Sequence, residues 1–390
     1  MSGYSLIYIS FDRFPAPKGA ATHISAFADA LGAEFGNLEL VTLPGREGFT
    51  MPEMRGVRHF ELPAQGANII TRAMAFRAEL GRWWSGRKVD VVHVRSIYEG
   101  YPLAKRKKDV CDFFVYEVNG LPSIELKYHY PEVDEDDELL RKLRNQEQTC
   151  LEAADLIITV SEVNSTHLQS RGVPPERIRV IPNGVDTKLF HWSKPQPKNG
   201  EPLQVLYTGT MTRWQGVHQA IEALQLYRRD FPAELLLAGP CRPHERKALH
   251  RTIDRLDMAR YVKLLNPVSQ QELVELIHSS HAVLAPLQPN DRNLDQGCCP
   301  LKVIEAMAAG TPLIASDMPV VSALADNGVE ALLVRPGSAK AIKDGLLRLQ
   351  EDAALGHRLS RAARTRVEKQ YTWSHATDAL LAAYHDFLGI

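Results

Sequence analysis

The sequence predicts an α/β protein made of two doubly wound, Rossmann-like domains. Two observations support this prediction: apolar runs rich in β-branched residues alternate with segments of helical period, and the series begins twice along the chain. Such runs are typical of parallel strands that are covered on both faces. Ligands of doubly wound sheets bind beyond the carboxyl ends of the strands. We therefore expect the two domains to face each other across a cleft lined by the loops that follow the strands.

The first series defines a domain over residues 1–190. Its strands are expected at 5–10, 38–43, 89–94, 113–118, 156–160 and 178–181. A helix is expected over 21–35, because Ile24, Phe27 and Leu31 recur at the spacing of one helix face.

The second series defines a domain over residues 203–370, after a linker at 191–202 that is rich in Pro, Lys and Gly. Its strands are expected at 204–207, 235–238, 261–265, 282–287 and 312–315, with helices at 216–229, 243–257, 270–279, 300–309 and 338–351. The loops expected to line the cleft are 15–20, 44–48, 208–216 and 288–300.

The composition argues against several classes of function. The chain has 390 residues and a net charge of −1, so nothing favours nucleic acid as the main ligand. Its five cysteines include no Cys-x2-Cys pair, which argues against structural zinc and indicates reduced thiols in a cytoplasmic protein. No window reaches the about 18 apolar residues that a membrane span needs. The N-terminus enters a strand without the features of a signal peptide.

Residues 297–315 predict an anion site: a loop, a short helix, a glycine stop and a buried strand. Pro300 is expected at the first helical position, where its missing N–H is no loss. The N–H groups of Leu301, Lys302 and Val303 would then point out of a helix N-terminus, which carries partial positive charge. The ammonium group of Lys302 adds a full charge, so a diphosphate fits this segment.

Glu305 follows on the same expected helix, just past one turn after the start. An ionised carboxylate there can accept two hydrogen bonds from a vicinal diol, such as that of a ribose. A diphosphate next to a ribose is a nucleoside diphosphate. The alternative is that Glu305 is only a solvated helix residue, although the Ala and Met residues that follow it favour close packing.

Short motifs occur in a fixed order along the chain: 181–186 (IPNGVD), 207–209 (YTG), 215–217 (QGV), 236–239 (LLAG), 285–286 (AP), 305–312 (EAMAAGTP) and 371–373 (YTW). Together they resemble the retaining glycosyltransferases of family 4, which have the GT-B fold. The resemblance implies transfer of a sugar from a nucleotide donor with retention at the anomeric carbon. It also implies that a C-terminal helix, 371–390, joins the first domain; the alternative is a plain helix of the second domain.

Three positions depart from the family pattern. The family usually has a Glu-x7-Glu motif whose second glutamate matches Glu305, and the first position of that motif is Gly297 here. The family also usually has an arginine after the glycine that matches Gly209 and a lysine before the next glycine. These two positions are Thr210 and Gln215 in this chain. The resemblance still implies that Gly209, Thr210 and Gln215 lie beside the donor.

Without those cations, other groups must stabilise the charge on the departing nucleoside diphosphate. We expect Lys302 to do so first and Arg213 second, with backbone dipoles at the helix start, Pro300 and Leu301. For Arg213 the alternative is a solvated loop residue. No cofactor and no metal is expected, because no Asp-x-Asp motif stands at a strand end.

The first domain is expected to supply the acceptor side of the site. The loop at Gly19 and Ala20 opens a helix and can offer backbone N–H groups to a phosphate. His23 follows on that helix, with acceptor contact, capping and a surface role as open alternatives. The resemblance places Asn119 where family members often carry a histidine beside the transferred sugar. Asn119 cannot shuttle a proton, which agrees with the front-face attack generally assigned to retaining enzymes of this fold.

Two further groups of residues are candidates for contacts. One set follows a strand end and is expected to help hold the acceptor: His93, Arg95 and Glu99. The other interleaves basic residues with tryptophan: Arg72, Arg77, Arg82, Trp83, Trp84, Arg87 and Lys88, followed by 105–108. The second pattern suits the anionic inner face of a membrane, where the protein would be peripheral. A charged outer helix face is the favoured alternative.

These features predict a metal-independent, retaining hexosyltransferase that uses a UDP- or GDP-linked sugar in polysaccharide biosynthesis. Its acceptor would be a glycan, a glycolipid or other lipid-linked molecule, or a small molecule; the sequence names neither base, sugar nor acceptor. One alternative is a nucleotide-sugar-binding pseudoenzyme, which would explain the missing glutamate and cations. Another is a non-hydrolysing sugar-nucleotide epimerase of the same architecture, which would convert the donor without an acceptor.

Overall fold

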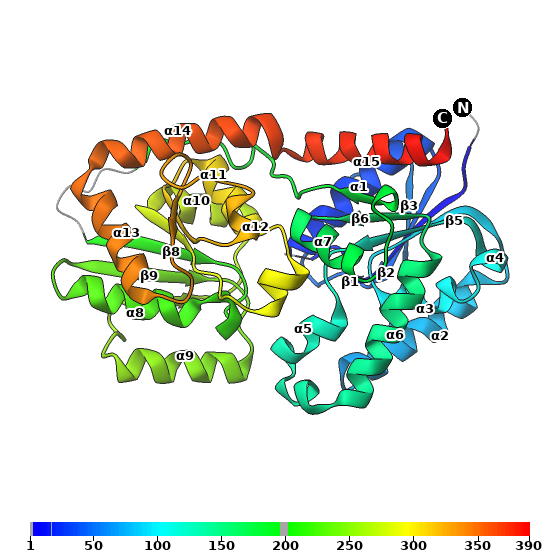
Figure 1. Cartoon of the computed structure of the whole chain (residues 1–390), viewed down its shortest axis with the longest axis horizontal. Helices are drawn as coiled ribbons and strands as arrows, with labels where there is room; N and C mark the ends of the chain where they lie inside the picture. Colours follow the sequence, from blue (N-terminus) through cyan, green and yellow to red (C-terminus); the bar gives the residue numbers. More distant parts are fainter. Residues whose placement is uncertain (1–2, 17, 196–201) are drawn as a thin grey trace. The chain divides into compact units, whose positions relative to one another are not determined.

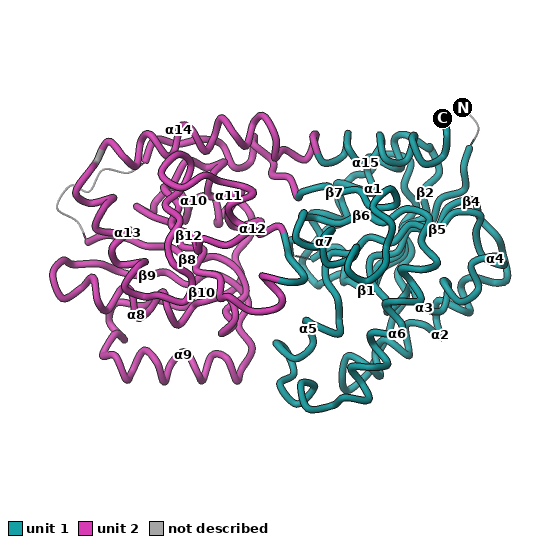
Figure 2. The backbone as a smooth tube through the Cα atoms, viewed as in Figure 1, with its two compact units in different colours: residues 1–182, 295–298, 376–390 teal, residues 183–294, 299–375 magenta. Residues whose placement is uncertain are grey.

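The computed structural model describes residues 3–16, 18–195 and 202–390. Contacts divide the chain into two compact units, which Figure 2 shows in different colours. Unit 1 contains Met1–Pro182, Asp295–Cys298 and Ala376–Ile390, and unit 2 contains Asn183–Leu294 and Cys299–His375. The sequence placed the first domain at 1–190 and a linker at 191–202, of which residues 196–201 lie outside the described residues.

Unit 1 is built on a seven-stranded sheet in the order β3-β2-β1-β4-β5-β6-β7. Its strands are β1 (Leu6–Arg13), β2 (Leu38–Leu43), β3 (Val57–Glu61), β4 (Val89–Val94), β5 (Cys111–Val118), β6 (Leu156–Thr159) and β7 (Ile178–Val180). All neighbouring strands are parallel. Because the order reverses between β1 and β4, the loops after these two strands leave the sheet next to each other.

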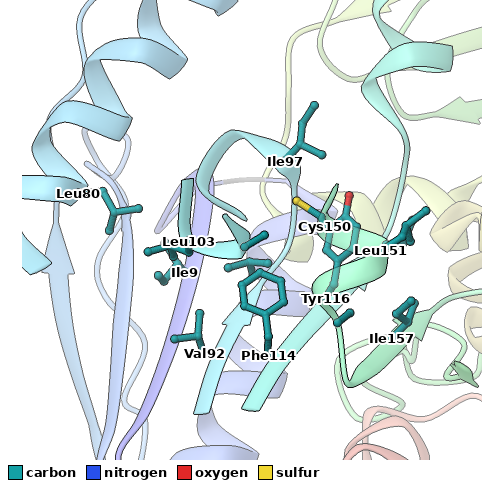
Figure 3. Close-up of a cluster of buried hydrophobic side chains, with 14 of the residues drawn as sticks. Ile9, Leu80, Val92, Ile97, Leu103, Phe114, Tyr116, Cys150, Leu151 and Ile157 are labelled. Atoms are coloured by element: carbon teal, nitrogen blue, oxygen red, sulfur yellow. The ribbon is translucent and has the colours of Figure 1, made fainter. Parts of the chain in front are cut away.

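The helices of unit 1 connect these strands in the manner of a doubly wound fold. They are α1 (Gly19–Phe35), α2 (Ile69–Trp84), α3 (Ile97–Ala104), α4 (Lys107–Val110), α5 (Pro122–His129), α6 (Asp137–Ala153) and α7 (Glu162–Ser170), with 3-10 turns at Pro131–Glu135 and Pro175–Arg177. Side chains from strands and helices meet in the core that Figure 3 shows: Ile9, Val92 and Phe114 with Leu80 and Leu103. Burying each such side chain contributes about 1.5–3 kcal/mol.

The C-terminal helix α15 (Trp373–Leu388) packs on unit 1. Figure 1 shows it in red beside α1. Tyr384 is fully buried, with its ring centroid 5.8 Å from that of Phe35. His385 Nε2 lies 2.8 Å from a carboxylate oxygen of Glu34. These contacts make the last helix part of the first unit's core.

Unit 2 is built on a six-stranded parallel sheet in the order β10-β9-β8-β11-β12-β13. Its strands are β8 (Leu203–Thr208), β9 (Ala233–Ala238), β10 (Val262–Leu265), β11 (Ala282–Ala285), β12 (Leu313–Ser316) and β13 (Leu332–Val334). Its helices are α8 (Val217–Arg228), α9 (Pro243–Arg255), α10 (Gln270–Ser279), α11 (Leu301–Ala309), α12 (Pro319–Ser322), α13 (Ala339–Glu351) and α14 (Ala353–Gln370). The predicted α/β class with two parallel, Rossmann-like sheets is confirmed.

Sequence reasoning missed β3, β13 and α14. β3 is an edge strand whose residues are all at least partly exposed, so it lacks the apolar run of a buried strand. β13 has only three residues. α14 is rich in arginine and has a low mean hydropathy. Its sequence therefore does not stand out as a helix with a buried apolar face.

Candidate functional site

In unit 2 the strand order reverses between β8 and β11, and glycines let the loops after the strands pack closely. Gly216 has a φ of 80°, and a Cβ there would lie 1.7 Å from the carbonyl oxygen of Pro286. Gly209 has a φ of 114° and donates its N–H to the carbonyl of Ala238 at 2.9 Å. Other residues would strain the backbone at both positions.

Helix α11 begins at Leu301, directly after Pro300. Pro300 has a ψ of 106°, which is extended, so the expectation that it occupies the first helical position is wrong. Its carbonyl oxygen accepts the N–H of Val303 at 3.0 Å. The N–H of Val303 is therefore not available to an anion, and a ligand at this helix start would meet only the earlier N–H groups of the turn.

The ammonium group of Lys302 lies among residues of β8 and the loop after it. It donates to the hydroxyl of Tyr207 at 3.1 Å and to Oε1 of Gln215 at 3.0 Å. It lies 4.2 Å from the ring centroid of Tyr207 and 3.1 Å from where a Cβ on Gly209 would stand. The structure thus brings together three residues that were assigned to the donor: Lys302, Gln215 and Gly209.

Glu305 lies on the same helix and is partly exposed. Its carboxylate has no hydrogen-bond partner within the described part of the chain. Burial raises the pKa of Glu305 to about 7, and the nearby Lys302 acts in the opposite direction. Desolvating a carboxylate without a partner is unfavourable, so this group is suited to a ligand that donates hydrogen bonds. Its surroundings argue against the alternative of a solvated helix residue.

Two arginines belong to the loops that follow strands of unit 2. Arg213 is exposed, in the loop after β8. Sequence reasoning missed Arg292, whose guanidinium lies 4.4 Å from the ring centroid of Trp214. In the sequence, only its position in the loop after β11 could have pointed to Arg292. Thr210 contributes its backbone carbonyl, which accepts from the hydroxyl of Tyr207 at 2.7 Å.

Gly297 stands where the resemblance led us to expect a glutamate, and its surroundings leave no room for a side chain. It has a φ of 79°, and a Cβ would lie 2.7 Å from Oγ of Ser161. The neighbouring Gln296 accepts from the N–H of Leu121 at 2.9 Å and donates to Glu125 at 3.0 Å. All five residues belong to unit 1, so this short segment is held on that unit.

A buried carboxylate, Glu117, organises the corresponding edge of unit 1. It lies in β5 and is fully buried. The Nε of Arg95 donates to its Oε1 at 2.9 Å, and Nε2 of His23 lies 3.0 Å from the same oxygen. The hydroxyl of Tyr8 donates to Oε2 at 2.8 Å, and Nε2 of His93 lies 3.2 Å from it. Glu117 is therefore enclosed by groups from β1, α1, β4 and the loop after β4.

These neighbours decide the protonation of the cluster. Burial alone would raise the pKa of Glu117, but His23 and Arg95 hold that pKa well below its usual range. Burial lowers the pKa of His93, whose Nδ1 lies 2.8 Å from the hydroxyl of Tyr384 in α15. Asn119 is partly exposed, and its Nδ2 donates to Oε1 of Glu117. The partly exposed Asn119 thus rests on a buried, ionised carboxylate.

Several expectations for unit 1 are wrong. His23 is only 3% exposed, which excludes a surface role, and its ring faces Glu117 rather than capping a helix. His93 and Glu99 are fully buried, so they cannot present a surface to an acceptor. Glu99 instead accepts from the N–H of Arg95 at 2.9 Å and from that of Ser96 at 2.8 Å, which caps α3.

The start of α1 differs slightly from the expected loop. The helix begins at Gly19, and Ala20 lies in its first turn. Lys18 is the N-cap residue, and its side chain makes no capping hydrogen bond. This end of α1 follows the loop after β1, on the same edge of the sheet as Glu117.

The basic residues near α2 are largely paired within the protein. Arg77 donates to the carbonyl of Tyr98 at 2.7 Å, and Trp84 is 3% exposed. Arg87 lies 4.0 Å from the ring centroid of Trp83. This pairing favours the alternative of a charged helix face over a membrane surface. Within the described ranges, no helix has the length and apolar character to cross a bilayer.

Two family models match the chain in succession. Residues 17–189 match the model described as Glycosyltransferase Family 4, and residues 190–366 match Glycosyl transferases group 1. The matched residues include all of α1, the loops after β4, β5, β8 and β11, and all of α11.

Individual proteins are similar to this chain at lower identity. A glycogen synthase of Mycobacterium tuberculosis is 27% identical over 63% of this chain, which covers 58% of that relative's length. The sucrose-phosphate synthase of Thermosynechococcus elongatus has a TM-score of 0.81 and 20% identity, covering 99% of both chains. HepE of Anabaena, solved in complex with UDP-glucose, has a TM-score of 0.76 and 17% identity, covering 98% of this chain and 100% of its own. These structural likenesses show the fold.

Proposed function

The chain belongs to the group 1 glycosyltransferases of family 4, and we propose on this premise that it transfers a hexose from a nucleotide sugar, with retention of the anomeric configuration. The observation that carries the proposal is the pair of Lys302 and Glu305 on α11. The first is a cation at a helix start, and the second is a carboxylate that has no hydrogen-bond partner among the described residues. A nucleoside diphosphate offers a diphosphate to the cation and a vicinal diol to the carboxylate.

Lys302 is proposed as the group that stabilises the leaving nucleoside diphosphate. Negative charge grows on the diphosphate as the glycosidic bond breaks, and a fixed cation is most effective where charge develops. Tyr207 and Gln215 hold the ammonium group in place before the donor arrives. Arg213 is proposed as a second, weaker contributor, because an exposed side chain is less fixed. With these cations present, the proposed reaction uses no metal and no cofactor.

Retention is proposed to follow because the acceptor attacks the anomeric carbon on the same face from which the leaving group departs. The acceptor oxygen forms a bond to the anomeric carbon while the bond from that carbon to the diphosphate oxygen breaks. The acceptor proton passes to the released phosphate oxygen. This route suits Asn119, which can hydrogen-bond a sugar hydroxyl but cannot act as a base. The start of α1, with Gly19 and Ala20, is proposed to contribute backbone N–H groups to a phosphate.

The donor is proposed to be a UDP- or GDP-linked sugar. The acceptor is proposed to be a glycan, a lipid-linked saccharide or a small hydroxylated molecule, and the setting polysaccharide biosynthesis in the cytoplasm. The likeness to HepE, which was solved with UDP-glucose, supports testing uridine nucleotides first.

The test has two steps. Thermal shifts with uridine, guanosine and adenosine diphosphates identify the base, and each matching sugar nucleotide is then assayed for hydrolysis and for transfer to saccharide acceptors. Transfer with a retained anomeric configuration, read by NMR, supports the proposal. An inverted product, or conversion of the donor to an epimer without acceptor, would refute it.

One observation favours a second candidate, a nucleotide-sugar-binding pseudoenzyme. Gly297 leaves no room for the glutamate that the family pattern has at this position. A pseudoenzyme would bind the nucleotide sugar but neither hydrolyse nor transfer it. Binding by calorimetry without any turnover would favour this candidate.

A further inference from the structure

The cluster around Glu117 contains a buried carboxylate that the proposed reaction does not use. Its side chain is fully buried, whereas Asn119, which rests on it, is partly exposed. A ligand at this edge of unit 1 would therefore meet the amide group of Asn119 and not the carboxylate beneath it. The feature to explain is how the carboxylate affects the orientation of that amide.

We propose that Glu117 is a positioning residue, which turns the amide of Asn119 so that its oxygen faces outward as an acceptor for a sugar hydroxyl. The inference rests on the proposed function, because it takes a hexose as the ligand. Its physical basis is the one-sided chemistry of a carboxylate, which only accepts hydrogen bonds when ionised. An asparagine amide has two different ends, and only the NH2 end can face such a group.

The carboxylate of Glu117 is held in its ionised form. Arg95 lies 2.9 Å from Oε1, and the pKa of Glu117 lies well below its usual range for the reasons given above. Nδ2 of Asn119 donates to the same oxygen. As long as Glu117 is ionised, turning the amide over would set two acceptors against each other, which is unfavourable. The amide oxygen of Asn119 must then point away from the carboxylate.

The carboxylate is also fixed in its position. Five groups lie within hydrogen-bonding distance of its two oxygens, which offer about four lone-pair sites; the groups belong to Tyr8, His23, His93, Arg95 and Asn119. His93 is held in turn, because its Nδ1 lies 2.8 Å from the hydroxyl of Tyr384. The hydrogen bonds from Tyr8, Arg95 and Asn119 restrain both oxygens of the carboxylate, and the amide of Asn119 faces it in this arrangement.

The decisive experiment compares two substitutions of Asn119. Asn119→Asp keeps the shape and an outward oxygen, but it replaces the N–H that faces Glu117 by a carboxylate oxygen, which the ionised Glu117 repels. Asn119→Ala removes the whole amide. We expect both to lower kcat/KM for transfer by about tenfold to a hundredfold, the usual effect of losing a hydrogen bond to a charged group. Wild-type activity in Asn119→Asp would overturn the inference, because an outward oxygen would then suffice without Glu117.

A double-mutant cycle tests the role of Glu117 itself. Glu117→Gln can meet the amide with either end, so it should lower kcat/KM in the wild-type background and add little to Asn119→Ala. Additive losses would show that Glu117 does not act through Asn119. The matched control is Glu147→Gln, which alters another fully buried carboxylate of unit 1 that contacts Ser123 and Arg171, and which should leave kcat/KM unchanged while lowering the melting temperature.

A readout without catalysis separates this inference from the proposed function. The side-chain amide resonances of Asn119, assigned by their loss in Asn119→Ala, should shift in Glu117→Gln and stay in place in Glu147→Gln. Unchanged resonances in Glu117→Gln would overturn the inference even if the protein proves to be an active transferase. If no sugar nucleotide is turned over but the resonances shift as expected, the proposed function fails and the positioning of Asn119 stands. If Glu117→Gln does not fold, wild-type activity in Asn119→Asp would still overturn the inference.

Discussion

Replacing Lys302 by Met tests the leaving-group role most directly. Met keeps much of the apolar stem and deletes the charge. The partners of Lys302 tolerate the loss: the hydroxyl of Tyr207 still donates to the carbonyl of Thr210 at 2.7 Å, and Gln215 is partly exposed to water. We therefore expect Lys302→Met to fold with little loss of stability, so that a change in activity reports on charge.

The size of the effect follows from where the charge lies. Two unit charges about 4 Å apart interact by about 4 kcal/mol at an effective dielectric constant of about 20. Removal of one positioned donor to a developing oxyanion typically lowers kcat by about 10²–10³. Because charge on the diphosphate grows in the transition state, kcat should fall by about a hundredfold or more. The dissociation constant of the donor should change less.

The assay measures turnover of the nucleotide sugar at saturating and at limiting donor concentrations. The dissociation constant of the donor is measured separately by calorimetry. Arg213→Met is the matched control, because Arg213 is a cation of the same unit whose side chain is exposed. It should lower kcat in the same way but more weakly. If Lys302→Met leaves kcat intact while Arg213→Met abolishes turnover, the two roles are reversed. If neither variant is impaired, the charge argument is wrong.

Four further predictions concern the same protein. Glu305→Gln should weaken nucleoside diphosphate binding by about tenfold to a hundredfold and inorganic diphosphate binding much less; equal weakening in calorimetry would contradict a ribose contact. Because the pKa of Glu305 is raised to about 7 and the ionised form accepts the diol, wild-type affinity should increase as the pH rises through that value, and Glu305→Gln should flatten the increase. Transfer should survive a chelator; its loss, with rescue by magnesium or manganese, would refute a metal-free mechanism. Gly297→Glu should lower the melting temperature rather than raise activity, because a Cβ at this position would lie 2.7 Å from Ser161 Oγ and φ is 79°; an active, equally stable variant would be incompatible with this packing.

The fold class could be predicted because buried parallel strands leave a local signal. β1 and β8 are short apolar runs followed by glycine or proline loops, and the twofold repetition of the series indicated two sheets. The position of Pro300 relative to the start of α11 was less predictable. Whether proline stands just before or just inside a helix depends on its ψ angle, which residue type leaves open.

The closeness of Lys302 and Glu305 could also be predicted, because both lie on one short helix. The cluster around Glu117 could not, because its members are distant in sequence and lie on different elements: β1, α1, β4, the loop after β4, and β5. Tyr8 and His93 become neighbours only through the register of β1 on β4. Tyr384 joins them only when α15 packs on unit 1. Sequence reasoning on single segments finds local chemistry and misses chemistry assembled by strand pairing.

The division of the chain has a practical consequence for fragment design. Because the polypeptide changes units after Pro182, Leu294, Cys298 and His375, neither unit corresponds to one continuous stretch of sequence. A fragment of residues 1–182 would lack Tyr384 and leave the ring of His93 without its partner. A fragment of residues 183–375 would carry Gln296 without the backbone of Leu121 that it binds. Separate expression of the halves therefore requires grafting the terminal helix onto the first and rebuilding the short segment at 295–298 in the second.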